Sequence, residues 1–546
     1  MTYIADMDAC QPQSALSKTA QPNHWRLVEY ESDEVSGTML AAGPLTDAPD
    51  VIYPLEQGGW HAIYVGYWNA NIGDSQRVAV KVKLTSDPYF TPIVDDEGDE
   101  LISSTLREAF WKYADLTGEQ IGFGQLTRGA MYPGYPAYLR LEPLSDDRVK
   151  QIQAERADTT KRVVIPTNDC GALLNGKAST EADICEQIEI YRHSDVGRLD
   201  WAVCYGDMVT YPSQVGWRYY EGWHEDPPRV SDAQSEESLR TLNGKGLIPH
   251  KVAMAYAHAI GIEFYAMIRI GIGTFVPPMD VIGGIYAERP ELRCLARDGT
   301  PLPKISYAYP EVRELMLDII REVADDELDG INLCFMRGVP LIGCEEPVVQ
   351  ALKEQYGVDL SDVSDDDERL ARVRSSFVTD FMRQVRIIAD EVGERRGRPL
   401  IVSVMANGTL DGGLLKSCDI RTWVEEKLVD EMVAVAVLTQ YLHANGVRHI
   451  IYVGPDGPAA YMSALLTCAE AGSDGVMVWD MNGVQELSDH WALLRQLGHT
   501  DRVIDHPDEL APLKRIPLTK VGDVDVTHTA PWGGVHKGAL LMYTNG

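Results

Sequence analysis

The sequence lacks the segments that direct a chain into or across a membrane. No apolar run reaches the roughly 18–20 residues that a membrane-spanning helix needs. The N-terminal segment MTYIADMDACQPQSALSK contains neither the basic region nor the apolar region of a secretory signal peptide. We therefore expect a soluble, cytoplasmic protein that does not bind membranes.

Basic residues are scarce in this chain. Lysine and arginine together number 49, against 82 aspartate and glutamate residues, and the formal net charge is −33. A field of this sign repels nucleic acid and anionic lipid, so we exclude both as partners. The acidity favours solubility but identifies no ligand. The oligomeric state stays open, and a homo-oligomer is compatible with the sequence.

Cysteine motifs are also missing. The chain has no Cys-x-x-Cys and no Cys/His pair at the spacing of a zinc site. Its nine cysteines are scattered, and several lie in apolar runs, where a free thiol behaves as a small hydrophobic group. Reduced thiols fit a reducing compartment, which agrees with a cytoplasmic protein.

Residues 1–150 show the pattern of β structure. The segments HAIYVGYWN (61–69) and RVAVKVKLTSD (77–87) are rich in β-branched and aromatic residues and partly alternate, and AYLRLEPL (137–144) resembles a further strand. Clusters of Gly, Pro and Asp separate these segments. The pattern predicts an N-terminal accessory β-sandwich or jelly roll, followed by a charged linker at 145–162.

Residues 151–505 repeat a pattern of apolar strand, loop and helix. The clearest helix is 309–326, where Pro310 stands near the first turn and apolar residues recur at helical spacing. Eight short runs, mostly apolar on both faces, are candidates for parallel strands covered by helices. They span 162–166, 200–205, 263–270, 330–336, 399–405, 431–438, 448–453 and 474–479. Eight βα units predict an α/β fold, a (β/α)8 barrel.

An open, doubly wound sheet is the alternative architecture. It is disfavoured because no Gly-x-Gly-x-x-Gly follows the first strand candidate, where TNDCGALLNG (167–176) stands instead. The remaining segment, 506–546, is strand-like again. It is expected to form a small C-terminal β segment, either alone or within the N-terminal sandwich.

Two segments of the barrel region carry a family resemblance. RPELRCLARDGTPLPKISYAYPEVRELMLDIIREVADDELDGINLCFMRG (289–338) and DIRTWVEEKLVDEMV (419–433) resemble the family-10-like glycosyl hydrolases. The likeness covers about 162–500 and implies a barrel acting on carbohydrate. The sandwich is similar to accessory β domains of some members. Cys334 stands where some relatives place an aspartate.

Polar residues follow the predicted strands where the active site of such a barrel is built, at the carboxyl ends. Cleavage of a glycosidic bond needs two carboxyl groups. The candidate catalytic residues are Asp169, Asp207, Glu345, Glu346 and Asp480. The candidate substrate-binding residues are Asn168, Tyr211, Arg269, Arg337, Gln440, Tyr441 and His443. Because strand position 334 carries no acid, we expect Glu345 or Glu346 to supply one carboxyl group of the pair.

Each candidate has a structural alternative. Glu345 and Glu346 precede a helical segment, so their acids can simply complement a helix N-terminus. Asp169 and Asp207 can be caps or turn residues, and Tyr211 can pack within its loop. His443 is the weakest of the acid–base candidates.

The sequence therefore predicts a glycoside hydrolase-like enzyme that needs neither a cofactor nor a metal and takes a carbohydrate substrate. One alternative is a carbohydrate-binding protein without catalysis. The other is a barrel enzyme whose metal is held by Asp169, Asp207 and Asp480, and carboxylate ligands would then favour Mg²⁺, Ca²⁺ or Mn²⁺ over zinc.

Overall fold

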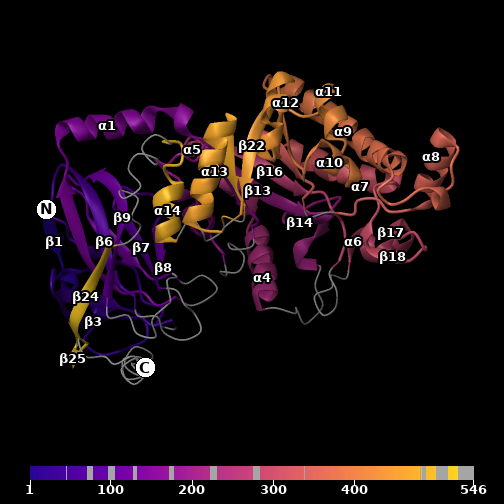
Figure 1. Ribbon diagram of the computed structural model, residues 1–546. Coiled ribbons are helices and arrows are strands. Elements are labelled where there is room, and N and C mark those ends of the chain that lie inside the picture. The colour runs from indigo at the N-terminus through magenta and orange to yellow at the C-terminus, as the bar shows by residue number, and fades with distance from the viewer. Residues whose placement is uncertain are drawn as a thin grey trace. The chain divides into compact units, whose positions relative to one another are not determined.

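The computed structural model divides into two compact units, each described here by itself (Figure 1). The first unit contains Met1–Lys161, Ala182–Asp195 and Gly483–Gly546, and the second contains Arg162–Glu181 and Val196–Asn482. The structure describes residues 1–44, 46–69, 78–95, 105–126, 132–170, 178–221, 230–274, 283–336, 339–406, 408–454, 456–479, 481, 487–499 and 514–526.

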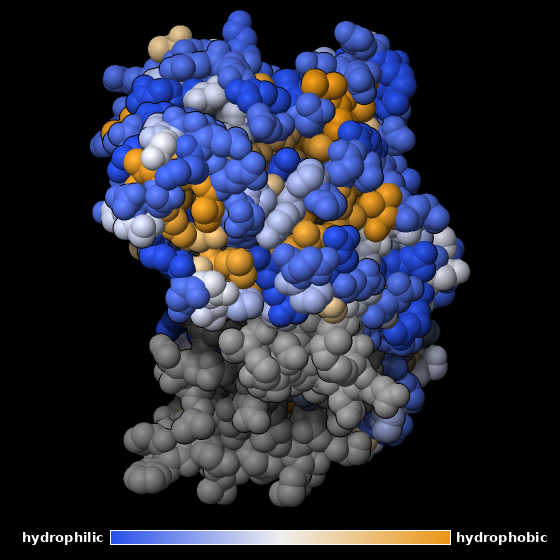
Figure 2. All heavy atoms as spheres, turned by 90° about the vertical axis from the view of Figure 1, so that its right-hand side faces the viewer, coloured by the Kyte–Doolittle hydropathy of each residue, from blue (hydrophilic) through white to orange (hydrophobic). Residues whose placement is uncertain are grey.

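The surface reflects the acidic composition. The face shown in Figure 2 is mostly hydrophilic, and its hydrophobic residues lie in separate groups. All nine cysteines are free and buried. Among the described residues, no helix combines the length and the apolar character needed to cross a membrane.

The first unit is built from two β-sheets. One has nine strands, with β1, β11, β6, β9, β24, β3 and β2 in order and β4 and β25 at the side, and the other has the order β5-β10-β7-β8. The strands are β1 Thr2–Ile4, β2 Leu16–Ser17, β3 Trp25–Ser32, β4 Gly37–Ala41, β5 Val51–Tyr53, β6 Trp60–Trp68, β7 Val78–Leu84, β8 Thr91–Asp95, β9 Thr105–Asp115, β10 Ile121–Gly124, β11 Pro136–Pro143, β24 Lys514–Val521 and β25 Val524–Asp525. Aromatic and β-branched side chains from both sheets share one core.

The C-terminal strand-like segment belongs to this first unit. β24 pairs antiparallel with β9 on one side and β3 on the other, so the yellow strand lies among the indigo and purple ones in Figure 1. The sequence left open whether this segment stands alone, and the pairing decides that it does not. The helices of this unit are α1 Asp146–Ala157, α3 Glu181–Glu189 and α14 Ser488–Leu494. The charged segment expected as a linker contains α1, whose N-cap Ser145 accepts the Arg148 N–H.

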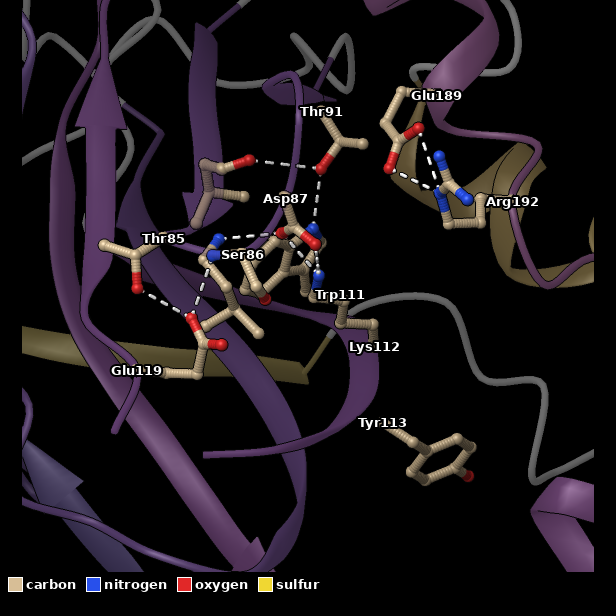
Figure 3. Close-up of polar contacts among 12 residues, drawn as sticks. Thr85, Ser86, Asp87, Thr91, Trp111, Lys112, Tyr113, Glu119, Glu189 and Arg192 are labelled. Carbon is tan, nitrogen blue, oxygen red and sulfur yellow. Dashed lines mark hydrogen bonds and ion pairs between the residues drawn. The ribbon is translucent and has the colours of Figure 1, made fainter. Parts of the chain in front are cut away.

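Polar side chains tie together the strands and turns of the first unit (Figure 3). The Trp111 indole donates to Thr91 at 2.7 Å, and Lys112 binds Asp87 at 2.6 Å. Glu119 accepts from the Thr85 hydroxyl at 2.7 Å. Burial lowers the pKa of Lys112, although Asp87 opposes that shift. These contacts are internal to the fold.

The second unit contains a closed barrel of eight parallel strands, which confirms the predicted fold class. The strands are β12 Val164–Asn168, β13 Arg198–Tyr205, β16 Glu263–Arg269, β19 Gly330–Cys334, β20 Ile401–Met405, β21 Glu431–Ala434, β22 Arg448–Val453 and β23 Gly475–Val478. β12 pairs with both β13 and β23, which closes the ring. The alternative of an open sheet is therefore wrong. β21 ends at Ala434, earlier than predicted, because Ala436–Leu438 forms a 3-10 turn.

Helices alternate with the barrel strands along the chain. They are α4 Val230–Gly244, α5 Pro249–Ala259, α6 Gly284–Glu288, α7 Pro310–Ala324, α8 Glu346–Tyr356, α9 Glu368–Arg396, α10 Leu410–Leu415, α11 Ile420–Glu425, α12 Thr439–Ala444 and α13 Pro458–Ala471. α7 begins at Pro310, as predicted. It buries an apolar stripe that includes Val312, Met316 and Ile320. Short strands β14 Met208–Val209 and β15 Trp217–Arg218 extend the sheet beyond β13, and β17 Arg293–Leu295 pairs with β18 Pro301–Ile305.

The barrel interior is arranged in layers. Near the strand N-termini, Arg198 binds Asp200 at 2.6 Å and Glu431 at 2.5 Å, and all three side chains are buried. Burial opposes the charge of Arg198, but these carboxylates hold its pKa above the usual value. Above them lies an apolar cluster formed by Ile165, Ala202, Met267, Cys334, Met405, Val433, Ile450, Met477 and Trp479. Side chains alternate along a strand, so the next inward residues reach the mouth.

Aspartates fix the N-terminal ends of alternate strands. They are Asp329, Asp430 and Asp474, which directly precede β19, β21 and β23. Each carboxylate accepts a backbone N–H from the preceding barrel strand at 2.8 Å, the donors being Phe264, Val402 and His449. The Asp-Gly-Ile sequence of the family resemblance thus has a physical role here, because its aspartate locks the register between β16 and β19.

Candidate active site

The end of β12 presents Asp169 at the barrel mouth. Asn168 is buried, and its side-chain oxygen accepts the Cys170 N–H at 2.7 Å, which forms a tight turn around Asp169. Cys170 has a φ of 61°, an uncommon conformation for a residue with a side chain. The turn redirects the chain directly after the strand and leaves the Asp169 carboxylate 19% exposed.

Arg269 ends β16 and forms an ion pair with Asp169. Its guanidinium carbon lies 5.1 Å from the Tyr205 ring and 5.3 Å from the Trp479 ring, within the range of cation–π attraction. Burial opposes the charge, but Asp169, Tyr205 and Cys334 leave the pKa of Arg269 raised. Its buried Nε has no hydrogen-bond partner among the described residues.

Tyr205 ends β13, between the strands that carry Asp169 and Arg269. Its hydroxyl donates to the Asp169 backbone carbonyl, which fixes the turn from below. Burial, with a further contribution from Asp169, raises the pKa of Tyr205 well above its usual value. The residue therefore stays protonated as a hydrogen-bond donor at neutral pH.

An apolar arc continues the mouth from β23 to β21. Trp479 lies directly beyond β23, and its ring centroid is 6.3 Å from that of Tyr452 on β22. Ala434 is the register partner of Ile451, so Val435 and Tyr452 follow at adjacent strand ends. Val435 is 43% exposed and Tyr452 36% exposed. Aromatic faces at such a rim can pack against the apolar faces of sugar rings.

Asp207 follows β13 and is buried at the start of α6. One carboxylate oxygen accepts the Ile285 N–H at 2.8 Å. Gly284 makes this approach possible, because a Cβ there would lie 2.3 Å from the carboxylate. Burial raises the pKa of Asp207 to about 6. A carboxyl group poised near neutrality can act as an acid, but this hydrogen bond also gives Asp207 a structural part.

The two glutamates expected to supply a catalytic carboxyl group are placed differently. Glu345 is fully buried, and its carboxylate accepts the N–H groups of Leu295 at 2.8 Å and Gly343 at 2.9 Å. The structure thus uses Glu345 to join β17 to the loop before α8 and does not present it to a substrate. Glu346 lies exposed in the first turn of α8, as the helix-start alternative predicts.

Four predicted binding residues lie outside the mouth cluster. Tyr211 is buried and donates to Glu322 of α7 at 3.1 Å, so it packs its loop. His443 binds Asp474, which precedes β23, at 2.8 Å. The remaining two are Gln440 and Tyr441, which share α12 with His443. Thr439, at the start of α12, already contacts His449 near the N-terminal end of β22. α12 therefore descends along the outside of the barrel, away from the mouth.

Two further predicted site residues, Arg337 and Asp480, lie outside the described residues. Where the structure describes the chain, no group of three or more His, Cys, Asp or Glu side chains is placed to hold a metal ion. Of the predicted site residues, the structure brings Asn168, Asp169 and Arg269 together at the mouth. The sequence analysis did not name Tyr205, Tyr452 and Trp479, which lie beside them. Side chains along a strand alternate between its two faces, so Trp479, two residues after the interior residue Met477, could have been identified as pointing inward.

Comparisons with known proteins give similarities among solved structures alone. No family model and no curated protein matches this sequence. The structure is similar to the glycoside hydrolase domain of PgaB (BpsB) from Bordetella bronchiseptica, with 13% identity, 61% of this chain and 98% of that chain covered, and a TM-score of 0.41. It is also similar to the catalytic domain of β-amylase from Paenibacillus polymyxa, with 10% identity, 62% and 98% coverage and a TM-score of 0.39.

A third similar structure is a ruminal GH26 endo-β-1,4-mannanase, with 8% identity, 91% and 95% coverage and a TM-score of 0.30. These neighbours are glycoside hydrolases of several families. The identities and TM-scores are low, so the likeness carries no conclusion about the chemistry of this chain. Membership of the family-10-like group stays a prediction.

Proposed function

We propose that this protein is a glycoside hydrolase-like enzyme that binds an oligosaccharide at the barrel mouth. The observation that carries the proposal is the ion pair of Asp169 and Arg269, held between the rings of Tyr205 and Trp479. A carboxylate beside aromatic walls suits a ligand that has both hydroxyl groups and apolar ring faces. Such a ligand is a carbohydrate.

In the proposed reaction, Asp169 acts as the ionised carboxylate that attacks the anomeric carbon or activates water. Arg269 forms an ion pair with this carboxylate and holds it at the mouth. Asp207 is the candidate proton donor, because burial raises its pKa to about 6. Asp480 remains an alternative donor from the sequence. Tyr205 positions Asp169 through its backbone carbonyl.

A carbohydrate-binding protein without catalysis is the second candidate. The observation in its favour is that Arg269 already engages the Asp169 carboxylate, which weakens it as a nucleophile.

The buried free thiols agree with the proposal of a cytoplasmic location, although they carry no information about the substrate.

The test starts with the wild-type protein on a panel of oligosaccharides with product analysis. Asp169→Asn should lower turnover of the identified substrate by about 10²-fold or more, while the dissociation constant changes little. Glu346→Gln removes an exposed acid and serves as the matched control. If the wild-type protein binds an oligosaccharide of the panel but cleaves none of them, its function is non-catalytic binding. Full turnover by Asp169→Asn would reject the proposed role.

A further inference from the structure

The chain beyond β16 brings a lysine to the mouth side of the barrel. Gly273 follows Arg269 by four residues and forms an antiparallel bridge with Lys304 of β18. The Thr274 N–H donates to the Pro303 carbonyl at 3.2 Å, and the Ile305 N–H donates to the Ile272 carbonyl at 3.0 Å. β18 therefore continues the edge of the mouth beyond the strand that carries Arg269.

The Lys304 side chain lies against the backbone at Gly273. A Cβ at position 273 would be 2.8 Å from Cδ of Lys304 and 3.3 Å from its Nζ. The missing side chain of Gly273 thus leaves the space that the lysine occupies. Four extended residues span up to about 13 Å, so the backbone of Gly273, beside Lys304, lies at most about this far from the backbone of Arg269.

Lys304 has no acidic partner among the described residues. Burial lowers the pKa of its ammonium group, and among the described residues Cys294 is the ionisable group that acts on it. Cys294 is itself buried, and burial raises the pKa of its thiol, so the thiol is neutral. In contrast, Lys251 binds Asp326 at 2.6 Å and Lys112 binds Asp87 at 2.6 Å.

The absence of an acid beside Lys304 among the described residues is unexpected in this chain. Acidic residues outnumber basic ones by 82 to 49, so a random neighbour of a lysine is more often acidic than basic. A partly buried charge without a partner destabilises a fold, because it loses hydration and gains no ion pair. A ligand that carries the opposite charge would supply the missing partner.

We propose that Lys304 binds an anionic substituent of the carbohydrate, a carboxylate, sulfate or phosphate group on a sugar next to the one at Asp169. The inference rests on the proposed function and specifies its substrate class. The donor is an ammonium group that can form charge-assisted hydrogen bonds with any of these three groups.

The experiment measures binding by calorimetry for the full-length protein. The ligands are trigalacturonate, its fully methyl-esterified neutral form, and O-sulfated and phosphorylated trisaccharides of equal length. The variants are Lys304→Met, Lys304→Arg and the control Lys353→Met, which changes the net charge equally at a lysine 54% exposed on α8. The anionic arms identify which charged group is preferred.

The wild type should bind at least one anionic trisaccharide about tenfold or more tightly than the neutral form. Lys304→Met should remove this preference, and Lys304→Arg and Lys353→Met should retain most of it. The melting temperature of Lys304→Met should equal or exceed that of the wild type, because the variant loses an unpartnered charge. Equal affinity for the neutral ligand, no anionic binding, or an unchanged preference in Lys304→Met would overturn the inference.

Turnover separates this inference from the proposed function. Hydrolysis of neutral and anionic substrates at equal rates would reject the role of Lys304 and retain the hydrolase. Anionic binding that depends on Lys304, without cleavage of any glycan on the panel, would retain the subsite and reject the hydrolase.

Discussion

Asp169 and Arg269 are 100 residues apart in the chain and form an ion pair at the barrel mouth. They end strands that are not neighbours, since β13 lies between β12 and β16. β12, β13 and β16 must therefore be paired in the correct register before this ion pair can form. The contact makes the mouth sensitive to the loss of either partner.

A double-mutant cycle with Asp169→Asn and Arg269→Met should give a coupling energy of about 1–3 kcal/mol in the free energy of unfolding. The pair is 17–19% exposed, so solvent screens it less than a surface pair. Urea denaturation of the four proteins measures this energy. The control cycle uses Asp325 and Arg395, which are 69% and 60% exposed, and should show a much smaller coupling. Equal couplings in the two cycles would contradict the prediction.

Glu345→Ala should lower the free energy of unfolding by about 2–3 kcal/mol. The change leaves the N–H groups of Leu295 and Gly343 buried without their acceptor. Denaturant titration of Glu345→Ala beside Glu346→Gln provides the comparison, and the second variant should match the wild type within error. A stable Glu345→Ala protein that has lost all turnover would instead point to a catalytic role for this residue.

The ionisation of Asp207 should lower the free energy of unfolding as the pH rises from about 4 to about 6. Burial raises the pKa of this carboxyl group in the folded state to about 6, above the unfolded value of 3.8, so the folded state binds more protons in this interval. The stability contribution of Asp207 is therefore fully present below the unfolded pKa and is lost as the pH passes the folded pKa. The total loss is about 3 kcal/mol at most.

The measurement is the difference in unfolding free energy between wild type and Asp207→Asn from pH 4 to pH 8. Asparagine keeps an oxygen for the Ile285 N–H but does not ionise, so the variant should gain stability relative to wild type as the pH rises. A difference that does not change with pH would show that Asp207 ionises in the folded state as it does in the unfolded chain.

Asp474→Ala should destabilise the barrel by about 1 kcal/mol and leave ligand binding unchanged. Its carboxylate accepts the His449 N–H and binds His443, and both contacts lie at the N-terminal end of the strands. Thermal unfolding and calorimetry on the same samples test the two parts of the prediction. Weaker ligand binding by Asp474→Ala at full stability would place a binding function at this end.

The sequence determined the barrel and three members of its mouth. The apolar strand candidates and the helix at Pro310 show residue periodicities that arise from local geometry. These elements can therefore be predicted without knowledge of tertiary contacts. Asn168, Asp169 and Arg269 could be predicted because the carboxyl ends of parallel strands converge on one side of a closed barrel. The same rule failed for His443, because the strand before it ends early and the chain has already turned into α12.

Only the tertiary structure decided which polar residues remain available to a ligand. Glu345 and Asp169 are both acidic residues, yet the Glu345 carboxylate is occupied by the N–H of Leu295, 50 residues away, and by the N–H of Gly343 in its own loop. Lys304 resembles any surface lysine in the sequence, and only the pairing of β18 beside Gly273 shows that its ammonium has no acidic partner among the described residues. Periodicity fixes the direction of a side chain within its own element, whereas burial and partners depend on elements that are remote in the chain. Closure of the barrel and return of the loops across its mouth bring those elements together.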